Sequence, residues 1–121
     1  MKKEEEIEQR KVIQYLDDLK HNSKHFVKFT SIPNSTHTKI YQALTKNTLD
    51  GLRAGLPDLF IIINKESFFI EMKKCKGGIV SNKQKAWIEA INQCNGTKAY
   101  VCNGFEEAKK IIDSYLNWGI N

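Results

Sequence analysis

Residues 57–73 read PDLFIIINKESFFIEMK, and this stretch decides the fold. Two runs of β-branched and aromatic residues, 58–63 and 67–73, flank the polar segment Asn64-Lys65-Glu66, a pattern typical of a β-hairpin. Both runs are apolar on both faces, as is usual for strands in the centre of a sheet that is covered on each side. The stretch therefore predicts two central strands of an α/β protein.

Three charged residues stand inside these apolar runs: Asp58, Glu71 and Lys73. If the hairpin turns at Lys65-Glu66, Asp58 faces Lys73, and Phe60 faces Glu71. Because side chains alternate along a strand, the three charged groups emerge on one face, with opposed Cβ atoms about 5 Å apart. A register shifted by one residue would separate them, so the expectation depends on the turn.

Two carboxylates buried together are costly unless a cation neutralises them. Mg²⁺ is held in proteins by one or two carboxylates together with phosphate oxygens, and it can activate water for attack on phosphorus. A neighbouring ammonium can orient or deprotonate that water, or stabilise the phosphate oxygens. Asp58, Glu71 and Lys73 therefore predict phosphodiester hydrolysis with Mg²⁺ or Mn²⁺. A structural ion pair between Glu71 and Lys73 is the alternative.

A second Glu-x-Lys sequence occurs at Glu107-Ala108-Lys109. It lies in a predicted helix, where residues two apart do not share a face, so we interpret it as solvated surface. Placement on a strand or on a helix thus separates the two copies.

The rest of the chain supplies helices on both sides of the hairpin and two further strands. The expected elements are a helix over 4–20, a strand over 26–30, an irregular segment over 31–56 with a helical turn at 40–44, a helix from the capping box Ser81–Gln84 to Gly96, a strand over 98–102, and a helix after Asn103-Gly104. With 121 residues, the chain is expected to form one domain over 1–121, with helices flanking a mixed sheet.

Composition narrows the function classes. Apolar residues make up 40% and charged residues 27%, as in soluble globular proteins, and no apolar run approaches the ~20 residues of a membrane span. No apolar leader is present, so we expect a cytoplasmic protein. The net charge of +5, from 19 basic and 14 acidic residues, permits a nucleic-acid partner without establishing one. The cysteines and histidines have no zinc-ligand spacing.

Several motifs in fixed order carry a family resemblance. Pro57-Asp58 followed by Glu71-Met72-Lys73 resembles the signature of the PD-(D/E)xK nuclease superfamily. A wider set resembles the virus-type replication-repair nuclease (VRR-NUC) family: 29–34, 50–59, 70–73 and 81–84. The resemblance runs from about Glu5 to Ile112, and members usually carry Leu or Val where this chain has Met72. It implies a restriction-endonuclease-like αβββαβ(α) fold.

The resemblance also implies roles for the charged residues. Asp58 and Glu71 would hold the metal together with the Met72 carbonyl, and Lys73 would handle the water. A carboxylate of the first helix would be a further metal ligand, and the candidates are Glu4, Glu5, Glu6 and Glu8. A helical wheel favours Glu5 and then Glu8. The alternative is that these acids are a solvated helix start stabilised by the helix dipole.

Gln84 has two interpretations. It completes the capping box with Ser81, and it shares a helical stripe with Trp87 that faces the sheet, where the family places a glutamine near the catalytic face. Four basic residues are candidate contacts to the DNA backbone: Lys74, Lys76, Arg53 and Lys39. An ordinary polar turn is the alternative for Lys74 and Lys76.

Stand-alone VRR-NUC members of similar length come from phages and bacteria, and some resolve Holliday junctions as homodimers. The resemblance therefore implies a structure-selective endonuclease that acts on branched DNA, such as a four-way junction, as a homodimer. Two alternatives remain: a flap or restriction-like nuclease without junction preference, and a non-catalytic DNA-binding module with the same fold.

Overall fold

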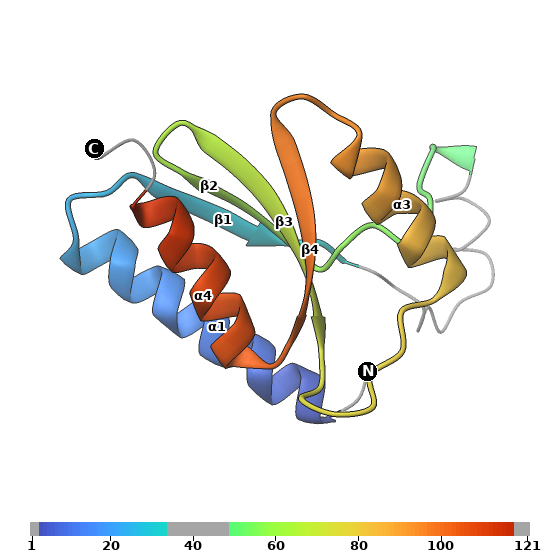
Figure 1. Ribbon diagram of the computed structural model, residues 1–121, viewed down its shortest axis with the longest axis horizontal. Helices are drawn as coiled ribbons and strands as arrows, with labels where there is room; N and C mark the ends of the chain where they lie inside the picture. The colour runs from blue at the N-terminus through green and yellow to red at the C-terminus, as the bar shows by residue number, and fades with distance from the viewer. Residues whose placement is uncertain (1–2, 34–48, 118–121) are drawn as a thin grey trace.

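The computed structural model describes residues 3–33 and 49–117 (Figure 1). Its elements follow the predicted order: α1 (Lys3–Asn22), β1 (Val27–Ser31), β2 (Leu59–Ile63), β3 (Glu66–Lys73), α3 (Asn82–Asn92), β4 (Thr97–Asn103) and α4 (Phe105–Leu116). The predicted helical turn over 40–44 falls outside the described residues. None of the helices within the described ranges is long and apolar enough to cross a membrane.

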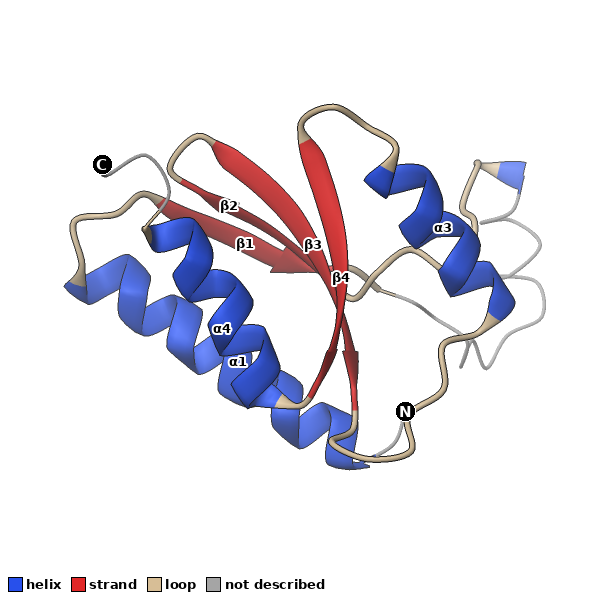
Figure 2. Ribbon diagram, viewed as in Figure 1, coloured by secondary structure: helices blue, strands red, loops and turns tan. Residues whose placement is uncertain are grey.

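One mixed sheet runs through the molecule in the order β1-β2-β3-β4. The pairs β1/β2 and β2/β3 are antiparallel, whereas β3/β4 is parallel and is connected through α3. Helices α1 and α4 lie side by side against one face, and α3 lies on the other (Figures 1 and 2). The predicted α/β fold is confirmed, and the two hairpin strands are central.

The main core lies between the sheet and the helix pair α1/α4. Alternate residues of β2 and β3 supply it, together with one stripe of each helix, and all are fully buried: Leu59, Ile61, Ile63, Phe68, Ile70, Met72, Val12, Leu16, Ala108 and Ile112. Because side chains alternate along a strand, the intervening residues point to the α3 face. Glu71 and Lys73 are among those intervening residues.

The hairpin turn is not the one predicted from sequence. Ile63 pairs with Glu66, so the two-residue turn is Asn64-Lys65 rather than Lys65-Glu66. Asn64 has φ 56°, a left-handed conformation that asparagine adopts more readily than most residues. The predicted register was therefore wrong by two residues.

The shift changes partners but not faces. Phe60 pairs with Phe69 rather than with Glu71, and the two rings lie 4.9 Å apart between centroids. Asp58 immediately precedes β2, and the same register continues to a position level with Glu71 rather than with Lys73. A shift of two residues preserves the side-chain alternation, so the three charged residues still belong to one face.

Candidate active site at the end of the central strands

The antiparallel pairing of β2 and β3 brings the beginning of one strand to the end of the other. Asp58 stands immediately before β2, and Glu71 and Lys73 are among the last three residues of β3. Helix α3 begins above the same end of the sheet, where Ser81 is its N-cap. The chain therefore gathers its candidate residues from three separate segments.

Glu71, Lys73 and Gln84 form a closed set of polar contacts. Nζ of Lys73 lies 3.2 Å from Oε2 of Glu71 and donates to Oε1 of Gln84 at 3.0 Å. Nε2 of Gln84 donates to the same Oε2 of Glu71 at 2.8 Å. The side chain of each residue is thus held by the other two.

Gln84 contacts both the start of α3 and the charged pair. Its backbone N–H donates to Oγ of Ser81 at 3.2 Å, and its Oε1 accepts the Ser81 N–H at 2.9 Å, which completes the capping box. The same Oε1 also accepts from Lys73. Because a carbonyl oxygen has two lone pairs, the helix cap and the site contact do not compete.

The side chain of Asp58 is hydrogen-bonded to the backbone of β3. Its Oδ2 accepts the N–H of Met72 at 2.8 Å. The Met72 side chain itself is fully buried on the opposite face of the sheet, in the core. The main chain of Met72 therefore holds Asp58 in place, while its side chain packs in the core and fixes the position of β3.

Two charged side chains of the site are almost fully buried. Glu71 is 2% exposed and Lys73 is 7% exposed, and they are the buried charged residues of the described ranges. Burial and, second to it, the negative charge of Asp58 together raise the pKa of Glu71 to about 7, although Lys73 opposes the shift. The charged form of Glu71 is therefore disfavoured in the metal-free site, even with Lys73 beside it.

The residues fit a hard divalent cation. Oε1 of Glu71 is buried and has no hydrogen-bond partner within residues 3–33 and 49–117, although its sister oxygen Oε2 has two donors. No cluster of three or more His, Cys, Asp or Glu side chains suited to a metal occurs in that same part of the chain. Two carboxylates, Asp58 and Glu71, are nevertheless a sufficient protein contribution for Mg²⁺, which retains water and phosphate ligands.

The acidic residues of α1 do not share one role. Oε1 of Glu8 accepts the N–H of Phe105 at 2.8 Å, and its Oε2 accepts from Lys11 at 2.8 Å. The contact with Lys11 is the main reason why the pKa of Glu8 is lowered. Glu8 therefore connects α1 to the start of α4. Glu5 is partly buried, but the structure does not bring it into a three-ligand group with the site carboxylates.

Sequence reasoning gave no role to Gln9. Its Oε1 is buried and has no hydrogen-bond partner among the described residues, a state it shares with Oε1 of Glu71. Gln9 follows Glu5 by one helical turn, on the face of α1 that carries buried Val12. The helical wheel showed this position, but only the packing of α1 showed an unsatisfied amide oxygen.

The residues predicted to contact the DNA backbone differ in exposure and in position along the chain. Lys74 is partly buried and Lys76 is exposed, and both follow β3 directly. Arg53 is exposed, and its Nη1 donates to the carbonyl of Leu52 at 2.9 Å. Lys39 lies outside the described residues. Three of the four candidates can therefore be placed, all in segments that adjoin Asp58 or Lys73.

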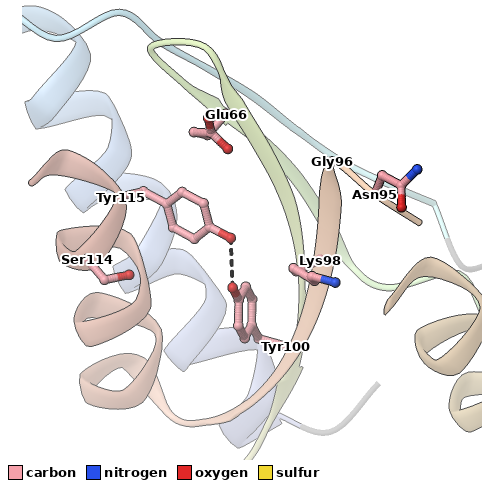
Figure 3. A pocket seen from close by; sticks show the side chains of 7 residues that line it. All are labelled: Glu66, Asn95, Gly96, Lys98, Tyr100, Ser114 and Tyr115. Atoms are coloured by element: carbon pink, nitrogen blue, oxygen red, sulfur yellow. Dashed lines mark hydrogen bonds between the residues drawn. The ribbon is translucent and has the colours of Figure 1, made fainter. Parts of the chain in front are cut away.

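One cavity among the described residues lies away from the charged site. It has a volume of about 440 Å³ and is lined by Glu66, Asn95, Gly96, Lys98, Tyr100, Ser114 and Tyr115 (Figure 3). Glu66 begins β3, whereas the charged site is at the end of that strand, so the cavity is at the opposite end of the sheet. The hydroxyls of Tyr100 and Tyr115 are hydrogen-bonded to each other at 2.7 Å, and none of the candidate residues contributes to the lining.

Comparison with known proteins agrees with the fold. The VRR-NUC domain model matches residues 3–106. A solved structure described as "VRR_NUC domain protein" superposes with a TM-score of 0.76 at 23% identity, covering 98% of this chain and 93% of that one. No curated protein matches the chain. Since the family model spans α1 through β4 and reaches the first two residues of α4, the chain belongs to the VRR-NUC family, a family of nucleases.

Proposed function

We propose that the protein is a divalent-metal-dependent endonuclease that hydrolyses phosphodiester bonds in DNA. The observation that carries the proposal is the pair of carboxylates, Asp58 and Glu71, at one end of the sheet with the buried ammonium of Lys73 beside them. A purely structural ion pair would not leave Oε1 of Glu71 buried without a partner in the described part of the chain.

In this proposal Asp58 and Glu71 hold Mg²⁺ or Mn²⁺, with the Met72 carbonyl as a further ligand. The bound ion would supply water activation and stabilisation of the charge that develops on the phosphate. Asp58 is already oriented by the Met72 N–H, and Glu71 offers the oxygen that Gln84 and Lys73 do not use. The protein groups are therefore preorganised before substrate arrives.

Lys73 orients the attacking water or a phosphate oxygen, and Gln84 orients the side chains of Lys73 and Glu71. Lys73 is fixed between Glu71 and Gln84, so its ammonium is available to orient the attacking water or to donate to a phosphate oxygen. Gln84 is anchored by the helix cap, and it holds both Glu71 and Lys73 from the side of α3. Loss of Gln84 would therefore loosen two reacting groups at once.

We infer the substrate from the net charge of the protein and from its family. A net charge of +5 favours a polyanion, and we assign phosphate contacts to Lys74, Lys76, Arg53 and Lys39. We further propose branched DNA, such as a four-way junction, as the preferred substrate and a homodimer as the active form. A domain with one site cuts both strands of a symmetric junction when two copies are related by a two-fold axis.

The decisive assay offers labelled four-way junction, flap, duplex and single-stranded DNA with Mg²⁺, Mn²⁺ or EDTA. We expect cutting that requires the metal, strongest on the junction. Asp58→Asn should reduce the rate by at least about 100-fold. Full activity of Asp58→Asn in Mg²⁺ would refute the site, and DNA binding without cleavage in any metal would favour the non-catalytic module.

A further inference from the structure

The connection from β3 to α3, residues 74–81, lies beside the proposed active site and carries an exposed isoleucine, Ile79. It contains Lys74 and Lys76 and no acidic residue. Ile79 in the same connection is 82% exposed. A large aliphatic group is thus presented to solvent from a basic segment that begins next to Lys73.

Gly78 fixes this connection against the catalytic strand. A Cβ atom at Gly78 would lie 2.7 Å from Cβ of Lys73 and 3.4 Å from its Cγ. The backbone of Gly78 therefore packs directly on the stem of Lys73. Ile79 is the next residue, so its backbone is held within one residue of that contact while its side chain points away from the protein.

Ile79 is one of several exposed apolar side chains. In the part of the chain that the structure describes, the large ones are Ile7, Phe26, Leu49, Leu52 and Ile79. Leu49 and Leu52 belong to segment 49–57, which precedes Asp58 in the sequence. Ile79 belongs to segment 74–81, which follows Lys73. A single exposed aliphatic residue on an ordinary surface needs no explanation, but Ile79 stands out because it belongs to a basic segment that packs on Lys73.

The segment before Asp58 is fastened to the beginning of α3. Nε1 of Trp87 donates to the carbonyl of Ala54 at 3.0 Å, and a Cβ at Gly55 would meet the backbone of Lys83 at 2.8 Å. Segments 49–57 and 74–81 therefore both border the N-terminal half of α3. Basic and apolar side chains are interleaved around that border.

We propose that Ile79 contacts an unstacked base next to the cleaved phosphate, and so determines a preference for DNA that contains unpaired or strained bases. The inference rests on the proposed nuclease function and specifies its substrate. Lysine contacts to phosphates position DNA without distinguishing one structure from another. An aliphatic side chain inserted at a base step discriminates, because unstacking costs least where a base is already unpaired.

The test is equilibrium binding in EDTA to two DNAs of equal length, an intact duplex and a duplex with one unpaired base, each with 2-aminopurine at that position. The variants are Ile79→Ser and the conservative Ile79→Leu. The matched control is Phe26→Ser, because Phe26 is 57% exposed and lies beside the Asn64 turn, at the opposite end of the sheet.

We expect wild type, Ile79→Leu and Phe26→Ser to bind the DNA with the unpaired base more tightly than the duplex and to raise its fluorescence. Ile79→Ser should lose about tenfold of that preference, the scale expected for losing a largely buried isoleucine contact, together with the fluorescence rise. An unchanged preference in Ile79→Ser would overturn the proposal, as would a change confined to the sedimentation of the free protein.

The two proposals fail in different ways. If the wild-type protein cuts no DNA with Mg²⁺ or Mn²⁺, the nuclease function fails, while the binding preference in EDTA still reports on Ile79. If it cuts but Ile79→Ser keeps the wild-type preference, only the role of Ile79 fails. An absence of any DNA binding by the wild-type protein would refute both.

Discussion

Nε2 of Gln84 lies 2.8 Å from Oε2 of Glu71, so the first turn of α3 is hydrogen-bonded to the central strand β3. Gln84 is also half of the capping box that begins α3. A residue whose side chain both caps a helix and holds the buried carboxylate of Glu71 couples the position of that helix to the geometry of the site. The two functions can be separated by mutation.

Gln84→Ala should reduce the cleavage rate by at least about tenfold, because Glu71 loses a hydrogen-bond donor and Lys73 loses an acceptor. The variant should also lose about 1 kcal/mol of unfolding free energy with the cap. Single-turnover cleavage and urea denaturation measure the two effects.

Ser81→Ala is the matched control for Gln84→Ala. It removes the Oγ that caps the N–H of Gln84, but it keeps the Ser81 backbone N–H that orients the Gln84 side chain. Stability should therefore fall by about 1 kcal/mol while cleavage stays near the wild-type rate. Equal losses of cleavage in both variants would mean that Gln84 acts only as a cap.

Lys73→Ala should reduce cleavage by at least about 100-fold and leave the circular dichroism spectrum unchanged. Lys109→Ala, in the other Glu-x-Lys sequence, should leave cleavage at the wild-type rate. Lys109 is a surface residue of α4 that pairs with Asp113 at 3.0 Å, one helical turn away. Similar cleavage by the two variants would refute the assignment of Lys73.

Glu71→Gln should separate DNA binding from chemistry. It preserves the shape of the side chain but removes a negative charge from the place that a phosphate must approach, and it weakens the metal site. We expect junction binding in EDTA equal to wild type or tighter, with almost no cutting in Mg²⁺. Gel shift and cleavage on the same junction measure both. Loss of binding together with cutting would make Glu71 a structural partner of Lys73.

Metal affinity should depend on pH through Glu71. The pKa of this carboxyl is raised to about 7, first by burial and then by Asp58, so the metal-free protein is protonated there below that pH. A cation requires the carboxylate, and its affinity should therefore fall about tenfold for each pH unit below about 7 and level off above it. Calorimetric titration with Mn²⁺ between pH 5.5 and about 8.5 measures this. A flat profile would contradict the assignment.

The homodimer is tested by sedimentation. At micromolar concentration we expect a species of twice the 14.0 kDa chain mass, and paired incisions on opposing strands of a four-way junction. The same preparation must be assayed for cleavage. A monomer with full activity on the junction would contradict the proposed active form.

The sequence by itself determined the element order and the face on which the charges lie. Alternation along residues 58–63 and 67–73 places Asp58, Glu71 and Lys73 on one side for any register that differs by an even number of residues. That is why the predicted turn could be wrong by two residues without scattering the site. Local periodicity and side-chain alternation are properties of the chain alone.

The tertiary structure decided which partners those residues meet. Whether Gln84 caps a helix or holds Glu71 depends on how α3 lies over β3, and the structure allows both. The packing of α1 decides two further features. Glu8 accepts a hydrogen bond from the start of α4, and Gln9 has a buried oxygen with no partner among the described residues. These contacts join segments up to 97 positions apart, and local propensity carries no information about them.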